Sequence, residues 1–77
     1  MKADETLDCL GFFCPIPIVQ TAGKMKGLAP GKVLEVVGDD MGIKEDLPNW
    51  CKVTGNECLG VEEKDGHYHV FVRKTAK

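Results

Sequence analysis

The sequence predicts an α+β protein, a two-layer α/β sandwich with two helices on one face of a four-stranded mixed sheet, in the order β-α-β-α-β-β. Three features indicate this fold. Residues 32–40 are rich in β-branched side chains, two stretches carry apolar residues at helical spacing, and Asp65-Gly66 separates two alternating apolar runs. With 77 residues, the chain is expected to form one domain, 1–77, with a thin core.

The first elements are a strand and a helix. Residues 5–9 (ETLDC) predict a first or edge strand, and residues 10–13 (LGFF) a loop in which Gly11 is the flexible point. The helix is expected to begin at Pro15, because the N–H that proline lacks would be unpaired in a first turn anyway. Residues 29–32 (APGK) end it. Apolar residues recur inside it at helical spacing: Ile18, Ala22, Met25 and Leu28.

The strand 32–40 has apolar residues on both faces, Leu34 and Val36 on one and Val33 and Val37 on the other. The next stretch has helical spacing at Ile43, Leu47, Trp50 or Cys51, and Thr54.

Pro48 leaves two alternatives for this second helix. Either the helix kinks there, or a new helix begins with Asp46 as its N-cap and Pro48 in its first turn. Gly55 is a plausible C-terminal stop.

The last two strands form a hairpin around Asp65-Gly66. The turn predicts that Val61 pairs with Val70 and Leu59 with Val72. One face then carries Leu59, Val61, Tyr68, Val70 and Val72, and the other carries Cys58, Glu62, His69 and Phe71. On this pattern His67 and His69 point away from the core.

The sheet face without helices is expected to stay partly open, with Val33, Val37 and Phe71 on it. This patch could dock a partner or a second copy, so we expect a monomer or a weak dimer. The alternative is that these are scattered exposed apolar residues of no consequence.

Charge and hydropathy exclude several functions. The net charge is −2 and the lysines are scattered, so no direct nucleic-acid contact is expected. No apolar run approaches the ~18 residues that a membrane span needs, and the N-terminal MKADETLD lacks the apolar stretch of a signal peptide. We therefore expect a cytoplasmic protein without a membrane contact.

Four cysteines stand at positions 9, 14, 51 and 58. Their spacings do not fit paired zinc ligands, so neither a metal nor a cofactor is expected, and free thiols are the default in a cytoplasmic protein. Cys51, beside Trp50, is expected in the core. Cys58 is taken as structural, on the strand face away from the main core.

Cys14 has the most unusual setting. It directly precedes Pro15 at the expected head of a helix, where the unpaired N–H groups and the dipole, worth roughly 0.3–1 kcal/mol, favour an anion. Pro15 and Pro17 stiffen the chain so that the sulfur projects outward, which suits attack on another sulfur. The alternative is a capping or half-buried thiol. Cys9 is a candidate resolving thiol for a regulatory disulfide with Cys14.

Three stretches of the sequence resemble a known family. The stretch LDCLGFFCPIPIV (7–19) resembles the Leu-Asp-x-x-Gly-x-x-Cys-Pro-x-Pro signature of the TusA/SirA-like sulfur carriers. The stretches LAPGKVLEVVGDD (28–40) and EDLPNWCKVTGNE (45–57) are similar to later parts of the same family. The chain departs from many relatives at Ala22-Gly23, where they carry a basic residue, and at Met41, where they often carry proline.

The resemblance implies a fold like the C-terminal domain of translation initiation factor three. It implies a carrier rather than a stand-alone enzyme, with a persulfide on Cys14 received from a cysteine desulfurase or a rhodanese-like donor. The sulfur would pass to a DsrE-like or other acceptor protein, toward tRNA thiolation, molybdenum-cofactor assembly or sulfur oxidation. Asp8, Gly11, Pro15 and Pro17 match the motif around the cysteine.

From the residues alone we expect Asp8 to anchor the loop by hydrogen bonding. Two other functions stay open. One is a binding or regulatory module that does not use Cys14, and the other is a thiol redox switch of Cys9 and Cys14.

Overall fold

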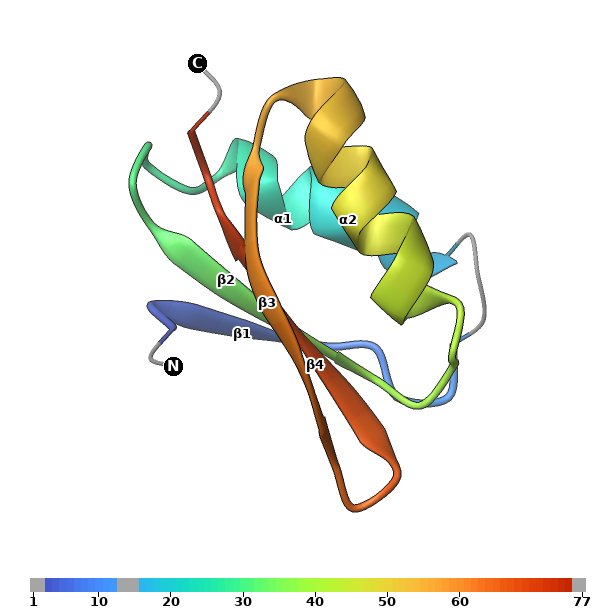
Figure 1. Ribbon diagram of the computed structural model, residues 1–77. Coiled ribbons are helices and arrows are strands. Elements are labelled where there is room, and N and C mark those ends of the chain that lie inside the picture. The colour runs from blue at the N-terminus through green and yellow to red at the C-terminus, as the bar shows by residue number, and fades with distance from the viewer. Residues whose placement is uncertain (1–2, 13–15, 76–77) are drawn as a thin grey trace.

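The computed structural model describes residues 3–12 and 16–75. Along the chain they form β1 (Glu5–Asp8), α1 (Ile16–Lys26), β2 (Val33–Gly38), α2 (Ile43–Thr54), β3 (Glu57–Lys64) and β4 (His67–Arg73), as Figure 1 shows. The predicted order β-α-β-α-β-β is confirmed.

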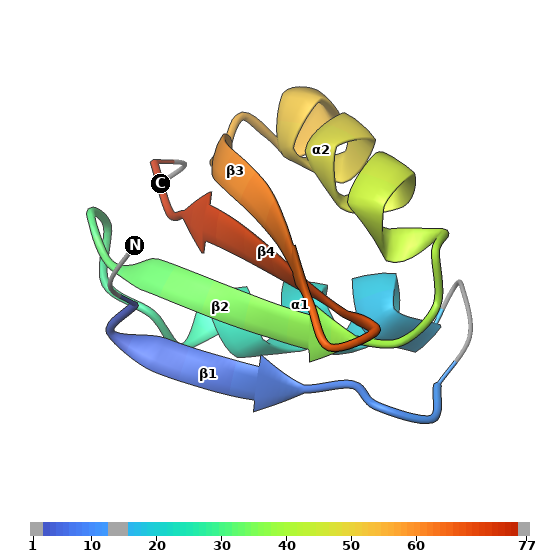
Figure 2. The ribbon, with the colours of Figure 1, turned by 60° about the horizontal axis from the view of Figure 1, so that its bottom comes forward.

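The strands form one mixed sheet in the order β1-β2-β4-β3 (Figure 2). β1 runs parallel to β2, with Leu7 opposite Val36, while β2 and β3 are each antiparallel to β4. A parallel neighbour requires a crossover connection, and α1 supplies it between β1 and β2. The carboxyl ends of β1 and β2 therefore lie at the same edge of the sheet.

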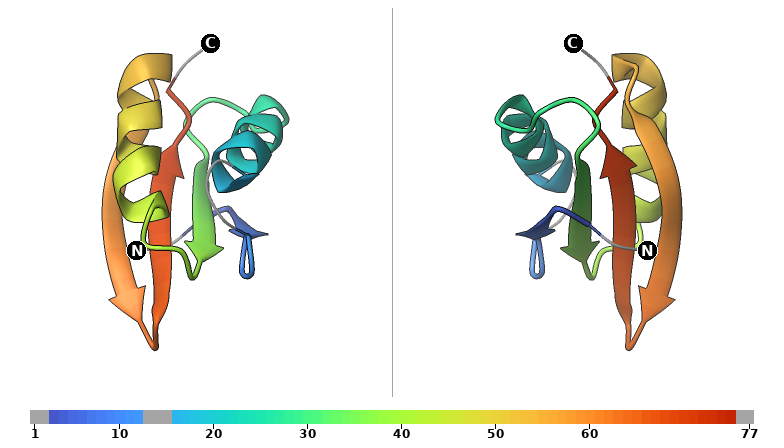
Figure 3. Two further views of the ribbon diagram at one scale, coloured as in Figure 1. Left: turned by 90° about the vertical axis from the view of Figure 1, so that its right-hand side faces the viewer. Right: turned by 90° about the vertical axis from the view of Figure 1, so that its left-hand side faces the viewer.

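Both helices cover the same face of the sheet (Figure 3), which confirms the two-layer sandwich. The sheet contributes Leu34 and Val36 from β2 and Val70 and Val72 from β4, each with an exposed fraction of 0%. The helices contribute Met25, Ile43, Leu47 and Cys51 to the same core cluster. The buried side chains of β2 and β4 thus share one face of the sheet, and both helices pack against that face.

α1 begins at Ile16, and Pro15, where we predicted its start, lies outside the described residues. Its buried residues are Pro17, Thr21 and Met25, four positions apart along one face of the helix. Ala22, predicted on this face, is only half-buried, because the face is rotated by one position toward Thr21. The hydroxyl Oγ1 of Thr21 is buried and has no hydrogen-bond partner in the described part of the chain.

α2 is one helix with Pro48 inside it, so the predicted alternative of a new helix capped by Asp46 is wrong. Proline removes only the bond that its N–H would make to the carbonyl of Lys44, and the rest of the helix continues. The apolar face of Ile43, Leu47 and Cys51 is buried in the core and stabilises the helix across this gap.

The predicted stop of α2 is confirmed. Gly55 has a left-handed conformation, with φ of 85°, and its N–H donates to the carbonyl of Cys51 over 2.9 Å. Glycine adopts this conformation without the steric penalty of a side chain.

The hairpin turn is confirmed, but one part of the predicted register is wrong. Asp65 and Gly66 both have positive φ, 54° and 78°, as a two-residue hairpin turn of type I′ requires. Val61 pairs with Val70 as predicted. Leu59 does not pair with Val72.

Cys58 takes the place opposite Val72, because a bulge between Cys58 and Gly60 inserts one extra residue into β3. The bulge reverses the faces of the residues before it. Cys58 therefore packs against the core cluster, and the prediction that it lies on the opposite face is wrong.

The sheet face without helices offers less apolar surface than predicted. Phe71 alternates with Val70 and Val72 and so lies on this face, yet its exposed fraction is only 3%. Beside it, Nδ1 of His69 lies 2.6 Å from Oε2 of Glu35, which confirms that this histidine points away from the core. A docking patch centred on Phe71 is therefore not supported by its exposure.

Candidate functional site

The predicted carrier cysteine lies in the connection between β1 and α1. β1 ends at Asp8 and α1 begins at Ile16, and Cys14 with Pro15 falls outside the described residues. The geometry of the site comes from the segment before it, residues 9–12, and from the first turns of the helix after it.

The loop after β1 is held against the end of β2. The N–H of Cys9 donates to the carbonyl oxygen of Val37 over 2.7 Å, which extends the strand pairing by one residue. Further along, the N–H of Gly11 donates to Oδ1 of Asp39 over 3.1 Å. The parallel pairing causes this contact, because it brings the carboxyl ends of both strands to one edge of the sheet.

The loop also makes hydrogen bonds within itself. Oδ1 of Asp8 accepts a hydrogen bond from the N–H of Leu10 over 2.9 Å, as we expected for a loop-anchoring carboxylate. The N–H of Phe12 donates to the carbonyl of Cys9 over 3.2 Å. Gly11 has φ of 85°, a left-handed conformation that favours glycine, so the turn of the loop requires this residue. Its predicted flexibility stays a prediction.

Asp39 is a residue of this site that the sequence reasoning missed. It follows β2 directly, and the sequence reasoning treated it only as part of a stretch similar to the family. Asp8 ends β1 and Asp39 directly follows β2, and the two come to one edge of the sheet only because these strands are parallel. Together the two carboxylates accept the N–H groups of Leu10 and Gly11, and this fixes the backbone that leads to Cys14.

The first turn of α1 favours an anion. It contains no acidic residue, while Lys24 and Lys26 lie in the last turn. The positive end of the helix dipole is therefore not neutralised by a side chain of its own first turn, and a thiolate nearby is stabilised. Pro17 lies in this turn with its ring buried. Pro17 thus anchors the start of the helix to the core, while its stiffening of the chain around Cys14 stays a prediction.

The two buried cysteines are poor nucleophiles. Burial, and in second place the Asp8 carboxylate, raises the pKa of the Cys9 thiol, whose exposed fraction is 0%. Burial, with a smaller contribution from Cys58, raises the pKa of the Cys51 thiol to about 12. Because the thiolate is the reactive form, both remain protonated at neutral pH. Cys51 is in the core as predicted, and the burial of Cys9 counts against its role as a resolving thiol for Cys14.

Large apolar side chains are exposed around this end of the molecule. Their exposed fractions lie between 38% and 66%, and they are Leu10, Phe12, Ile16, Val19 and Met41. They come from the loop after β1, the first two turns of α1 and the turn before α2. The hydrogen bond between Gly11 and Asp39 connects the loop to this turn. Exposed apolar side chains gathered in one region are typical of a surface that contacts another protein.

Within residues 3–12 and 16–75, no group of three or more metal-ligating side chains comes together. No helix among these residues is long and apolar enough to span a membrane.

The chain is similar to known proteins in sequence and in fold. The family model of the sulfurtransferase TusA matches residues 5–74. The sulfur carrier protein TusA of Pseudomonas entomophila is 38% identical over 95% of this chain and 91% of its own length. A SirA-like protein from Desulfitobacterium hafniense, whose crystal structure is known, superimposes with a TM-score of 0.82 at 27% identity, over 92% of this chain and 97% of that one.

Other relatives are longer. A putative sulfur carrier protein of Bacillus subtilis is 46% identical over 96% of this chain, which spans 40% of that protein. One of Aquifex aeolicus is 38% identical over the whole of this chain, which spans 39% of it. The match over residues 5–74 and the relative of similar length lead to one conclusion: the chain belongs to the TusA family of sulfur carriers.

Proposed function

We propose that the protein carries sulfane sulfur as a persulfide on Cys14 and relays it from a donor protein to an acceptor protein. The observation that carries the proposal is family membership together with the place of Cys14 in the chain, two residues before Ile16, the first residue of α1. The anchored loop before Cys14 and the unneutralised positive end of α1 after it support a presented, activated thiol.

The transfer needs no external oxidant. The Cys14 thiolate attacks the outer sulfur of the persulfide on the donor. The sulfur–sulfur bond of the donor breaks, its cysteine leaves as a thiolate, and a persulfide forms on Cys14. In the second half of the relay, the thiolate of an acceptor attacks the outer sulfur on Cys14 in the same way. One sulfur atom moves at each step, and the number of thiolates is unchanged.

The partners are proteins in this proposal. The donor is a cysteine desulfurase or a rhodanese-like protein, and the acceptor is a DsrE-like or other sulfur-accepting protein in the cytoplasm. The exposed apolar side chains around the site, Phe12, Ile16, Val19 and Met41 among them, support contact with a protein surface. Delivery toward tRNA thiolation, molybdenum-cofactor assembly or sulfur oxidation depends on the acceptor.

Intact mass measurement tests the proposal. The protein is incubated with a cysteine desulfurase and cysteine, and we expect the mass to rise by one sulfur atom. The increase should disappear in Cys14→Ser and persist in Cys58→Ser, which removes a half-buried thiol. The same result is expected when a rhodanese and thiosulfate replace the desulfurase. An unchanged mass with both donor classes, or an increase that survives in Cys14→Ser, would contradict the proposal.

A further inference from the structure

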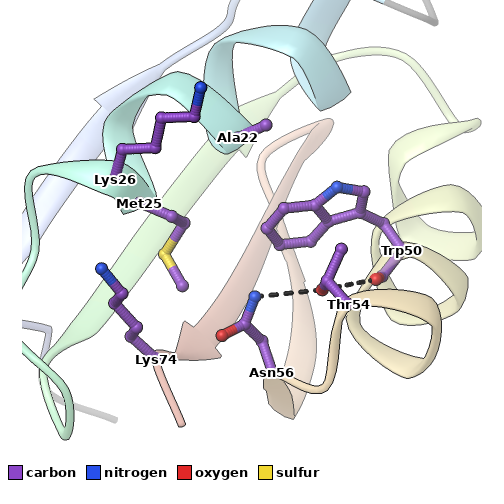
Figure 4. A pocket seen from close by; sticks show the side chains of 7 residues that line it. All are labelled: Ala22, Met25, Lys26, Trp50, Thr54, Asn56 and Lys74. Atoms are coloured by element: carbon purple, nitrogen blue, oxygen red, sulfur yellow. Dashed lines mark hydrogen bonds between the residues drawn. The ribbon is translucent and has the colours of Figure 1, made fainter. Parts of the chain in front are cut away.

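A cavity of about 270 Å³ opens at the other end of the two helices (Figure 4). It is lined by Ala22, Met25, Lys26, Trp50, Thr54, Asn56 and Lys74. These residues come from the second half of α1, the second half of α2 and the segments that flank β3 and β4. Met25 stands nine positions after Ile16, which corresponds to about 14 Å along the helix. The cavity is therefore separate from the first turn of α1, where the connection that contains Cys14 ends.

Part of the cavity wall is apolar. The indole ring of Trp50 and the thioether of Met25 point toward the same space from opposite helices (Figure 4). The indole N–H of Trp50, which is only half-buried, donates no hydrogen bond to residues 3–12 or 16–75. Aromatic and thioether surfaces of this kind contact the apolar part of a ligand.

Two lysines give the cavity a positive charge. Nζ of Lys74 donates to the carbonyl oxygen of Leu28 over 2.7 Å, which holds this half-buried side chain in place. An ammonium group has three N–H donors, so two remain available. Lys26 lies opposite Trp50 and makes no ion pair within the described part of the chain. None of the described residues that line the cavity is acidic.

The remaining polar side chains of the cavity are paired with each other. Oγ1 of Thr54 donates to the carbonyl of Trp50 over 2.7 Å, and Nδ2 of Asn56 donates to Oγ1 of Thr54 over 3.0 Å (Figure 4). The N–H of Thr75 donates to Oδ1 of Asn56 over 3.3 Å. This edge of the cavity is thus fixed in the free protein. What it offers a ligand is apolar surface and positive charge.

We propose that this cavity binds a short segment of a partner protein in which an Asp or Glu carboxylate stands beside an aromatic or large aliphatic side chain. The apolar side chain would lie between Met25 and Trp50, and a carboxylate on either side of it would meet Lys26 or Lys74. A space of about 270 Å³, open to solvent, fits a few side chains of a passing chain better than an enclosed small molecule. The choice of a protein as the ligand rests on the proposed function, in which both partners are proteins.

Trp50 makes the test direct, because the chain contains one tryptophan. The probe is the peptide acetyl-Glu-Phe-Glu-amide, and its neutral counterpart is acetyl-Gln-Phe-Gln-amide. We expect the acidic peptide to change the fluorescence of Trp50 with a saturable curve and a dissociation constant of about 1 mM or tighter. We expect the neutral peptide to bind about tenfold more weakly or worse, and added salt to weaken only the acidic peptide.

Lys26→Glu and Lys52→Glu form a matched pair. Both lysines are exposed and lie in the last turn of a helix, so both changes have the same effect on charge and on the helix dipole, but only Lys26 lines the cavity. We expect Lys26→Glu to weaken the acidic peptide at least about tenfold and Lys52→Glu to change it by less than about twofold. Circular dichroism verifies that both variants are folded.

Three results would overturn the proposal: no saturable change with the acidic peptide, equal binding of the neutral peptide, or equal weakening by both substitutions. The test is independent of sulfur chemistry. Cys14→Ser should bind the peptide like the unsubstituted protein, and Lys26→Glu should still form a persulfide on Cys14 from a small-molecule donor. The experiments therefore distinguish a failure of the peptide-binding proposal from a failure of the proposed sulfur-carrier function.

Discussion

The buried hydroxyl of Thr21 leads to a prediction with an unusual sign, namely that a core substitution should stabilise the protein. The side chain has an exposed fraction of 0%, and its Oγ1 finds no hydrogen-bond partner in residues 3–12 and 16–75. A buried hydroxyl without a partner loses its hydrogen bonds to water and gains none. Replacement by a methyl group in Thr21→Val removes this penalty and keeps nearly the same shape.

The expected size follows from that penalty. An unpaired buried donor or acceptor costs about 1–3 kcal/mol, and valine and threonine have similar helix propensities. We therefore expect Thr21→Val to raise the free energy of unfolding by about 1–2 kcal/mol. In a domain of 77 residues, each kcal/mol moves the midpoint of thermal unfolding by about 4–8 °C.

Urea unfolding followed by the fluorescence of Trp50 measures this change, provided that the slope with denaturant is equal in both proteins. Thr54→Val is the matched control. It makes the same chemical change where the hydroxyl is paired, since Oγ1 of Thr54 donates to the carbonyl of Trp50 and accepts from Asn56. We expect the control to lower the free energy of unfolding, by about 1 kcal/mol or less at this exposed position. A loss of stability in Thr21→Val, equal to or larger than in the control, would refute the reasoning.

Three further predictions concern a helix, a buried thiol and the loop before Cys14. Gly23→Ala should raise the free energy of unfolding by about 1 kcal/mol, because Gly23 lies inside α1 and an added Cβ would meet no atom within 4 Å. The thermal midpoint measures it, and an unchanged or lower midpoint contradicts it. The free energy of unfolding should fall as the pH rises above about 8.5, the pKa of a thiol in an unfolded chain. The fall should continue toward about 12, the pKa of Cys51 in the folded protein. In that interval the unfolded chain holds fewer protons, so the loss is at most about 1.4 kcal/mol per pH unit from this group. Cys51→Ala should reduce the slope, and an equal slope in both proteins would count against the raised pKa. Asp39→Ala should slow the loading of Cys14 with sulfur while lowering the free energy of unfolding by only about 1 kcal/mol, because it frees the N–H of Gly11. Asp39→Asn keeps an oxygen acceptor and should retain most of the rate. Equal rates in Asp39→Ala and the unsubstituted protein would show that the contact does not position the loop.

The elements were predictable where local pattern and tertiary packing agree. The β-branched run of the strand 32–40, the turn at Asp65-Gly66 and the stop at Gly55 each depend on a few adjacent residues, and the structure contains all three. Pro48 was misleading because the prediction weighed one lost hydrogen bond without the buried face that offsets it.

Features that depend on two distant segments could not be read in this way. The bulge after Cys58 lies in the pairing of β3 with β4, and the isolated Gly60 inside the strand is the sign of it that the prediction passed over. Because side chains alternate along a strand, this one extra residue moved Cys58 to the other face. The contact of Gly11 with Asp39 joins residues 28 positions apart and exists only because β1 and β2 are parallel. The Cys-Pro-x-Pro motif could be recognised in the sequence, but the hydrogen bond between Gly11 and Asp39 that supports the loop before it could not.

The antiparallel pairing of β2 with β4 has a last consequence. Gly38 faces Tyr68 at one edge of the sheet, and Val33 faces Arg73 at the other, where the lysine-lined cavity opens. The loop after β1, which is held against the end of β2 by Val37 and Asp39, and the cavity thus lie at opposite poles of the sheet. A peptide seated at one pole should leave an alkylating reagent free to reach the other, so kinetic experiments should show no competition between the two.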